Sequence, residues 1–300
     1  MPQRGPGGVT AAPTWPGGAR AAVSITVDNL GEAAELQLGL RDADAPLGGH
    51  YSVTTALPIV LGLLAAADLR ATFFVEGINA ETYPDALADI DAAGHEVAFH
   101  AWCHEEWGAL GAEEEAANLD RGLAALDAIG LRPDGFRPPG GLLTPRTLDL
   151  LAERGVRYVS PAGSAPGVER GVTVLPFAWP AVDAFHVLPA FAALREHVTG
   201  DPAAGGAEAT RAALHRAIDD VLATQGHAVL VLHNWLIESE LDAVRDVLAR
   251  VGELRAAGEL WAATCREVVA EAAFSAPPRL DRTSWTAPDP RPAPGPDPPR

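Results

Sequence analysis

The strongest constraint in this 300-residue sequence is a pattern that occurs four times, in which a short, strand-like apolar run ends directly on a polar residue. Such runs lead into Asp28-Asn29, His100, Arg137 and His233. When parallel strands form a barrel or an open sheet with covering helices, the residues just past their carboxyl ends meet on one face, where these folds carry their sites. The pattern therefore predicts an enzyme with these side chains at one end of a parallel sheet.

Apolar, β-branched runs alternate with segments of helical periodicity along the chain, which predicts repeated strand–helix units. The expected fold is α/β, a barrel of parallel strands with outer helices. The predicted strands are Ala21–Val27, Ala71–Val75, Glu96–His100, Gly135–Arg137, Val156–Val159, Val172–Leu175, Ala228–Leu232 and Leu260–Ala263. The predicted helices are Thr54–Ala67, Tyr83–Ala93, Ala112–Leu131, Thr144–Glu153, Glu208–Thr224 and Glu238–Ala256.

The two ends of the sequence differ from this pattern. Residues 1–20 are rich in glycine and proline, and residues 274–300 form a proline-rich segment with little apolar surface. Such composition cannot bury enough surface to fold, so both segments are predicted to be disordered. The barrel domain is predicted to span residues 21–273.

Composition excludes several classes of partner. A formal net charge of -18 disfavours nucleic-acid binding, which depends on cationic neutralisation of phosphates. No apolar stretch of secretory type follows a basic N-terminal end, so a cytoplasmic protein without a membrane span is expected. Cys103 and Cys265 form no metal-binding or disulfide pattern and are expected to be reduced thiols. No prediction of oligomeric state follows from the sequence.

His100 and His104 form the most specific local signal, because two imidazoles four residues apart can face the same metal ion. Asp28-Asn29 would then supply a free carboxylate as a base and an amide oxygen as a third ligand. Two alternatives stay open at these residues. Asp28 itself binds the metal, or Asp28-Asn29 is only a turn after a strand.

Arg137 and His233 complete the set of strand-end residues. Arg137 precedes the rigid Pro138-Pro139-Gly140 segment and is placed to hold a catalytic carboxylate in its ionised form. The alternative for Arg137 is an ordinary surface salt bridge. His233 follows a run of four large apolar residues, where a lone histidine is more often structural, but its match with the other strand ends favours a catalytic role.

In this order, these residues resemble the polysaccharide deacetylase family, also called carbohydrate esterase family four, over roughly residues 21–272. The motifs that carry the resemblance are Thr26-Val27-Asp28-Asn29-Leu30, His100 to His104, Arg137 to Gly140 and Val231-Leu232-His233. Members of the family hydrolyse acetamido groups on a deformed (β/α) barrel, so the resemblance implies this fold and this chemistry for the chain.

The resemblance also assigns roles to particular residues. It implies that Asp28 is the base, that His233 is the acid, and that Arg137 assists them. It implies a divalent metal, zinc before cobalt, nickel or manganese, held by Asn29, His100 and His104. A saccharide or other small molecule would bind at a set of residues that comprises Pro138, Pro139, Gly140, Asp183 and Trp235.

The chain departs from the family pattern in three places, one of which is Ala101, where the family has a hydroxyl residue in its second motif. Asn29 stands where the family has a second aspartate, and the aspartate of the family's fourth motif is absent. Asp183 is the candidate to replace it, with an ordinary surface aspartate as the alternative. The segments at residues 49–53 and 104–107 resemble a subgroup related to allantoinases and cyclic-imide hydrolases.

The expected function is metal-dependent removal of an acetyl or formyl group from an N-acylated amino sugar or a related small molecule. Two alternatives remain: a metal-independent hydrolase of cyclic amides, and a noncatalytic barrel that binds an acylated sugar.

Overall fold

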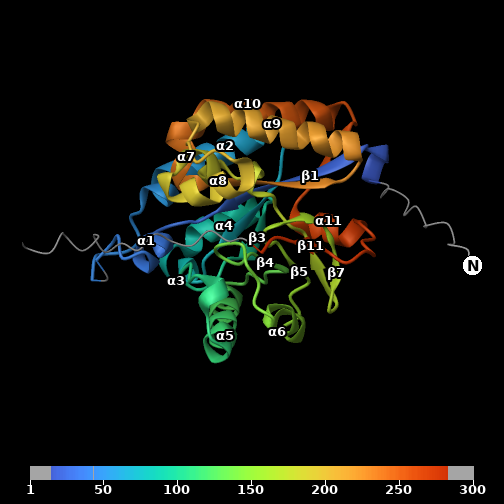
Figure 1. The fold of residues 1–300 in the computed structure, drawn as a ribbon. Coiled ribbons are helices and arrows are strands. Elements are labelled where there is room, and N and C mark those ends of the chain that lie inside the picture. Colours follow the sequence, from blue (N-terminus) through green and yellow to red (C-terminus); the bar gives the residue numbers. More distant parts are fainter. Residues whose placement is uncertain (1–14, 43, 283–300) are drawn as a thin grey trace, which may run out of the picture.

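The computed structural model describes residues 15–42 and 44–282. A curled, mostly parallel sheet lies at its centre, and helices surround the sheet (Figure 1). Its strands run in the order β10-β1-β2-β3-β4-β5-β8-β7, and β9 also pairs with β1. All of these pairs are parallel except that of β7 with β8. The strands are β1 (Ala21–Asp28), β2 (Ala71–Val75), β3 (Glu96–Phe99), β4 (Gly135–Phe136), β5 (Tyr158–Val159), β6 (Gly163–Ala165), β7 (Gly167–Glu169), β8 (Val172–Val174), β9 (His227–His233), β10 (Leu260–Ala262) and β11 (Arg279–Leu280).

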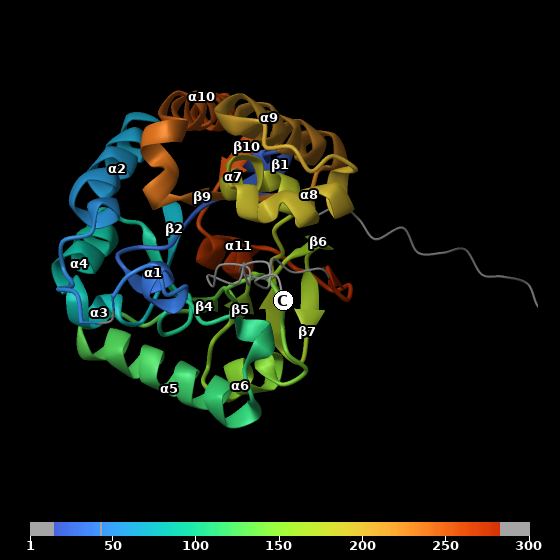
Figure 2. The same ribbon diagram turned by 60° about the vertical axis from the view of Figure 1, so that its left-hand side comes forward.

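Most helices form an outer ring, which Figure 2 shows with α2, α4, α5, α9 and α10 around the strands. In the same view α1 lies inside the ring. The helices are α1 (Ala33–Gln37), α2 (Leu57–Ala66), α3 (Asn79–Thr82), α4 (Pro84–Ala92), α5 (Ala112–Ala128), α6 (Thr147–Glu153), α7 (Asp183–Val187), α8 (Ala192–Thr199), α9 (Gly206–Thr224), α10 (Ile237–Ala256) and α11 (Cys265–Glu271). This arrangement confirms the predicted barrel-like α/β fold with parallel strands inside and helices outside.

Strand β1, which is the first predicted strand, is a central strand of the sheet. All eight of its residues are buried, and it pairs with β2, β9 and β10. A strand covered on both faces reads as a continuous apolar run, as expected for a central parallel strand. The strand therefore fixes the position of Asp28, its last residue.

All eight predicted strands and all six predicted helices are present, with differences at their ends. Helix α6 begins at Thr147 and not at Thr144. The Thr144 hydroxyl lies outside the helix and donates to the Glu115 carboxylate at 2.8 Å. A π-helical turn at Ser52–Ala56 precedes α2. Strands β6, β7 and β11 were not predicted, since segments of two or three residues carry no readable period.

The described structure extends beyond the predicted domain limits at both ends. Trp15 is buried and its indole N–H donates to the Gln225 carbonyl. At the other end, β11 pairs with β6 in antiparallel orientation. The other residues predicted to be disordered, 1–14 and 283–300, lie outside the described part of the chain. Within the described residues, no helix combines the length and apolar character needed to cross a membrane.

Candidate active site

The polar residues at the strand ends meet at one end of the barrel. Asp28 and His233 are the last residues of β1 and β9 and lie in register as Cα partners. His100 and Arg137 directly follow β3 and β4, and the Arg137 N–H donates to the Phe99 carbonyl. These four side chains, with Asn29 and His104, line one cavity of about 310 Å³. The convergence expected for carboxyl ends of parallel strands is therefore present.

Asp28 and Arg137 form a buried ion pair, with 2.6 Å between the guanidinium and Asp28 Oδ1. The same guanidinium donates to the hydroxyls of Thr26 and Ser160 and stacks over the Phe74 ring at 4.0 Å. Arg137 is 1% exposed, so the alternative of an ordinary surface salt bridge is wrong. These contacts fix the arginine in one position and orient the carboxylate that it holds.

His233 forms the second pair of the site, with Asp183. His233 Nδ1 donates to Asp183 Oδ1 at 2.5 Å, and the His233 backbone N–H donates to Oδ2 at 2.6 Å. Burial opposes a charged imidazolium, but the adjacent Asp183 carboxylate outweighs burial and raises the pKa of His233. Because Nδ1 is occupied, Nε2 is the nitrogen that can exchange a proton. Asp183 is 1% exposed and is therefore not a surface aspartate.

His100 and His104 lie in a tight turn in which Ala101 and His104 adopt left-handed backbone angles, φ 64° and 62°. The two rings are 5.1 Å apart and nearly perpendicular. His100 Nδ1 donates to the Arg137 carbonyl at 2.8 Å, which leaves Nε2 as an electron-pair donor. Burial lowers the pKa of both histidines to about 3, so both imidazoles are neutral and able to bind a metal.

Asn29 directly follows Asp28 and also has a left-handed backbone, with φ 61°. Its side chain is buried, and its Oδ1 atom has no hydrogen-bond partner. A buried carbonyl oxygen without a partner is costly and calls for an explanation. A cation at the site would satisfy it.

Glu76 is a site residue that the sequence reasoning missed. It directly follows β2 and is 0% exposed, and burial raises its pKa to about 8. Glu76 Oε2 accepts hydrogen bonds from the Leu30 backbone and from Asn79, but Oε1 has no partner. The signal that identified the other four strand ends, an apolar run that ends on a polar residue, is also present at Phe73-Phe74-Val75-Glu76.

Glu76, His100 and His104 each offer a ligand atom, and these atoms lie within 4.8 Å of one another. Two imidazoles and one carboxylate are a common protein ligand set for catalytic zinc. Asn29, whose Oδ1 has no hydrogen-bond partner, lines the same cavity as His100 and His104 and offers a further oxygen. The residues present therefore fit a divalent cation. The fit is better when Glu76 supplies an oxygen ligand than when the neutral Asn29 is the only residue to do so.

The predicted substrate-binding residues divide into two groups. Pro138, Gly140 and Trp235 line the cavity. Pro139 is not among the described residues that line it. Asp183 does not line it either, and its contacts are those of a residue that positions His233. A residue that replaces the missing fourth-motif aspartate would have to hold His233 through such hydrogen bonds.

The fold and the site together define a curled (β/α) barrel that carries two acid–base pairs and a candidate metal cluster at the carboxyl ends of its strands. Residues 44–159 match the family model described as polysaccharide deacetylase. Chitin deacetylase 1 of Saccharomyces cerevisiae is 36% identical over 103 residues, which cover 34% of this chain and 34% of that protein. The chain spans about a third or less of the length of the first curated relatives that it matches.

Solved structures extend the similarity over a longer part of the chain. A protein from Mycobacterium smegmatis assigned to the polysaccharide deacetylases has a TM-score of 0.77 and 27% identity, with 91% of this chain and 98% of that chain covered. The Puue allantoinase has a TM-score of 0.67 at 19% identity, with 86% and 91% covered, which shows a shared fold. Residues 44–159 are thus similar to the polysaccharide deacetylase family, and the fold of the described chain is shared with solved structures over most of its length.

Proposed function

We propose that the protein hydrolyses the amide bond of an N-acylated amino sugar or a related small molecule, and that a divalent metal assists the reaction. Water adds to the acyl carbon, the carbon–nitrogen bond breaks, and a carboxylic acid and an amine are released. The family relationship supports a deacylase, since the matched relatives include chitin and peptidoglycan deacetylases.

The observation that carries the proposal is the pair of in-register residues at the ends of β1 and β9. Asp28 is held by a cation and His233 by a carboxylate, and both side chains line the same cavity. Two titratable groups in such opposite surroundings are suited to opposite proton-transfer roles. This arrangement supports a base and an acid that act on one substrate.

Asp28 is the proposed base. Arg137 fixes Asp28 Oδ1, so the carboxylate is oriented before the substrate arrives. As water attacks the acyl carbon, the carboxylate accepts one of its protons. The permanent charge of Arg137 makes it a poor acid, so it is proposed to orient Asp28 and not to transfer a proton.

His233 is the proposed acid. Asp183 stabilises its imidazolium and holds Nδ1, so Nε2 carries the proton that the departing nitrogen needs. Protonation of that nitrogen converts a poor leaving group into a neutral amine. Asp183 is a positioning residue, because it acts on the reaction only through His233.

Glu76, His100 and His104, with Asn29 beside them, are the residues proposed to hold the metal, with zinc favoured by this ligand set. When bound, a divalent ion polarises the acyl oxygen and acidifies water. The chain itself supplies two neutral imidazoles and, from Glu76, a carboxyl group that a bound cation would hold in its ionised form.

A second candidate function is ring opening of a cyclic amide without a metal. The small cavity favours it, because a compact ring fits there more easily than a polymer. Chelator treatment separates the two candidates, since ring opening without a metal would survive removal of the metal.

The test is amine release from a panel of N-acetyl and N-formyl compounds by the wild type, Asp28→Asn and His233→Gln. We expect each substitution to lower turnover by about 10²–10⁴-fold. Because each leaves a buried charge without its partner, the thermal unfolding midpoint should also fall, so turnover is compared at a temperature at which both variants are fully folded. Asp246→Asn, at a second His–Asp pair on the exposed surface of α10, is the matched control and is expected to keep full activity. Unchanged turnover in Asp28→Asn would refute the assignment of the base.

A further inference from the structure

The cavity of the proposed active site has walls that differ sharply from its reacting end. Its polar side chains are those of Asp28, Asn29, His100, His104, Arg137 and His233. Apart from two tryptophans, every other described residue that lines it is Ala, Gly, Leu, Phe, Pro or Val. The described walls thus carry no carboxylate, amide or hydroxyl side chain beyond the reacting groups.

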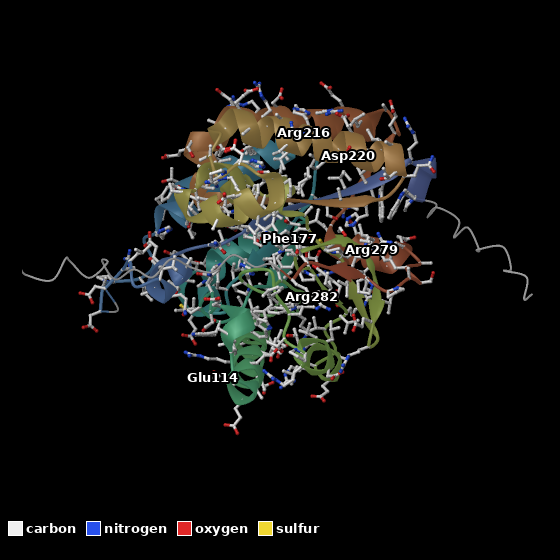
Figure 3. All side chains as sticks on the ribbon, viewed as in Figure 1. Glu114, Phe177, Arg216, Asp220, Arg279 and Arg282 are labelled. Atoms are coloured by element: carbon white, nitrogen blue, oxygen red, sulfur yellow. The ribbon has the colours of Figure 1, made fainter. Side chains whose placement is uncertain are left out.

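Part of this apolar wall belongs to a separate hydrophobic cluster that includes Phe177, Trp179, Val182 and Phe191. The Phe177 and Trp179 rings meet edge to face at 5.2 Å, and Trp179 and Phe191 are 5.8 Å apart. Figure 3 labels Phe177 near the middle of the molecule, in contrast to Glu114 at its edge. Packed rings of this kind form a rigid surface, so the cavity keeps its apolar character when a ligand enters.

The apolar wall lies on the side of His233. Val182 forms a strand bridge with Val231, two residues before His233. Asp183, which holds His233, begins α7, and Ala184 and Leu188 from this segment line the cavity. Because His233 is proposed to protonate the leaving nitrogen, the group carried by that nitrogen would lie against this wall.

We infer that the substrate is a compact amide whose nitrogen carries an apolar group, and not a polyhydroxylated sugar. This inference rests on the proposed amide hydrolysis and, of the two substrate classes named there, selects a related small molecule over an amino sugar. The cavity of about 310 Å³ is at the small end of the range of about 300–1,000 Å³ for ligand sites. A group of ring size fills it by burying apolar surface against Phe177, Leu188 and Phe191.

A sugar ring would enter the same space with hydroxyls that the wall side chains do not satisfy. Each hydroxyl that loses water without gaining a partner lowers affinity by about tenfold. With two such hydroxyls, the expected penalty is on the order of 100-fold. The preference for an apolar ring follows from this desolvation together with the apolar contact that the ring gains.

The experiment compares two amides that share a six-membered ring and an acetyl group, N-cyclohexylacetamide and N-acetylglucosamine. Binding of each to the full chain is measured by calorimetry, and amine release from each is followed in parallel. We expect N-cyclohexylacetamide to bind about 100-fold more tightly. Leu188→Asn, which places an amide in a half-buried part of the wall, should reduce that ratio about tenfold. Leu280→Asn, an exposed leucine outside the cavity, is the matched control.

The two readouts separate the inference from the proposed function. Tighter binding of the cyclohexyl amide supports the inference even when neither compound releases amine. The lack of amine release would refute the proposed hydrolysis and not the inference. Equal binding, tighter binding of the sugar, or no detectable binding of the cyclohexyl amide overturns the inference. Efficient hydrolysis of the sugar, with a higher kcat/KM than the cyclohexyl amide, overturns it while leaving amide hydrolysis in place.

Discussion

Replacement of Asp183 by asparagine is expected to change the charge state of His233 with little change of shape. In the structure, the Asp183 carboxylate accepts the backbone N–H of His233, the Nδ1–H of its ring and the backbone N–H of Ala184. An asparagine has only one carbonyl oxygen at that place. Whichever way it is turned, its NH₂ group faces at least one of these donors, so one hydrogen bond is lost.

The size of the effect follows from the bond that is lost. A hydrogen bond to a charged group is worth about 1.5–3 kcal/mol, and one pH unit corresponds to about 1.4 kcal/mol. The carboxylate raises the pKa of His233, so its removal should lower that pKa by about 1–2 units. The acid form of His233 exists below its pKa, and the basic limb of the kcat/KM profile should therefore move to lower pH by the same amount.

The assay is the pH profile of kcat/KM together with the NMR titration of His233 in both proteins. The titration does not depend on turnover, so it reports the pKa even if the variant is inactive. Asp246→Asn removes the carboxylate of a solvent-facing pair with His215 and should leave the His233 titration unchanged. If Asp183→Asn leaves both the basic limb and the titration in place, the proposed action of Asp183 on His233 is refuted.

Four further substitutions test the site and the barrel. Glu76→Gln should weaken zinc binding by at least about 100-fold in a chelator competition. Residues that only hydrogen-bond to a metal ligand already contribute about 10–100-fold to metal affinity, so a direct ligand should contribute at least as much. Unaltered zinc affinity would exclude Glu76 as a ligand. Arg137→Met should lower the free energy of unfolding by about 3–5 kcal/mol in urea, since Asp28 is left as a buried charge without its partner, and a loss below 1 kcal/mol would contradict this. Gly122→Ala should lower the free energy of unfolding by about 1–3 kcal/mol, because an added Cβ would lie 2.2 Å from the Phe99 ring. Gly62 has open space around it, so Gly62→Ala should raise the free energy of unfolding by about 0.5–1 kcal/mol.

The pattern of strand ends made most of the site predictable from the sequence. A buried parallel strand is apolar along its whole length, so a polar residue at its end stands out, and this identified Asp28, His100, Arg137 and His233. The structure places all four around one cavity. Their chemical roles remain proposals. Glu76 also ends an apolar run, after β2, but was not included among the predicted site residues.

The remaining features depend on contacts between distant segments. The Asp183 contact joins residues 50 positions apart and arises because α7 packs beside β9, which no local pattern reveals. The apolar wall likewise combines segments from β8 to α8 that carry no shared period. The short strands β6 and β11 form only because they pair with each other, so their two or three residues could not be recognised alone.

The central claim is metal-assisted amide hydrolysis, and the most direct test measures bound metal per chain and amine release on the same purified sample, before and after chelation. The account predicts about one divalent ion per chain, release of amine from at least one N-acyl compound of the panel, loss of that release with chelator, and recovery when zinc is restored. Absence of both metal and amine release would contradict it and favour a binding protein. Release that survives complete removal of the metal would contradict it in favour of metal-independent ring opening.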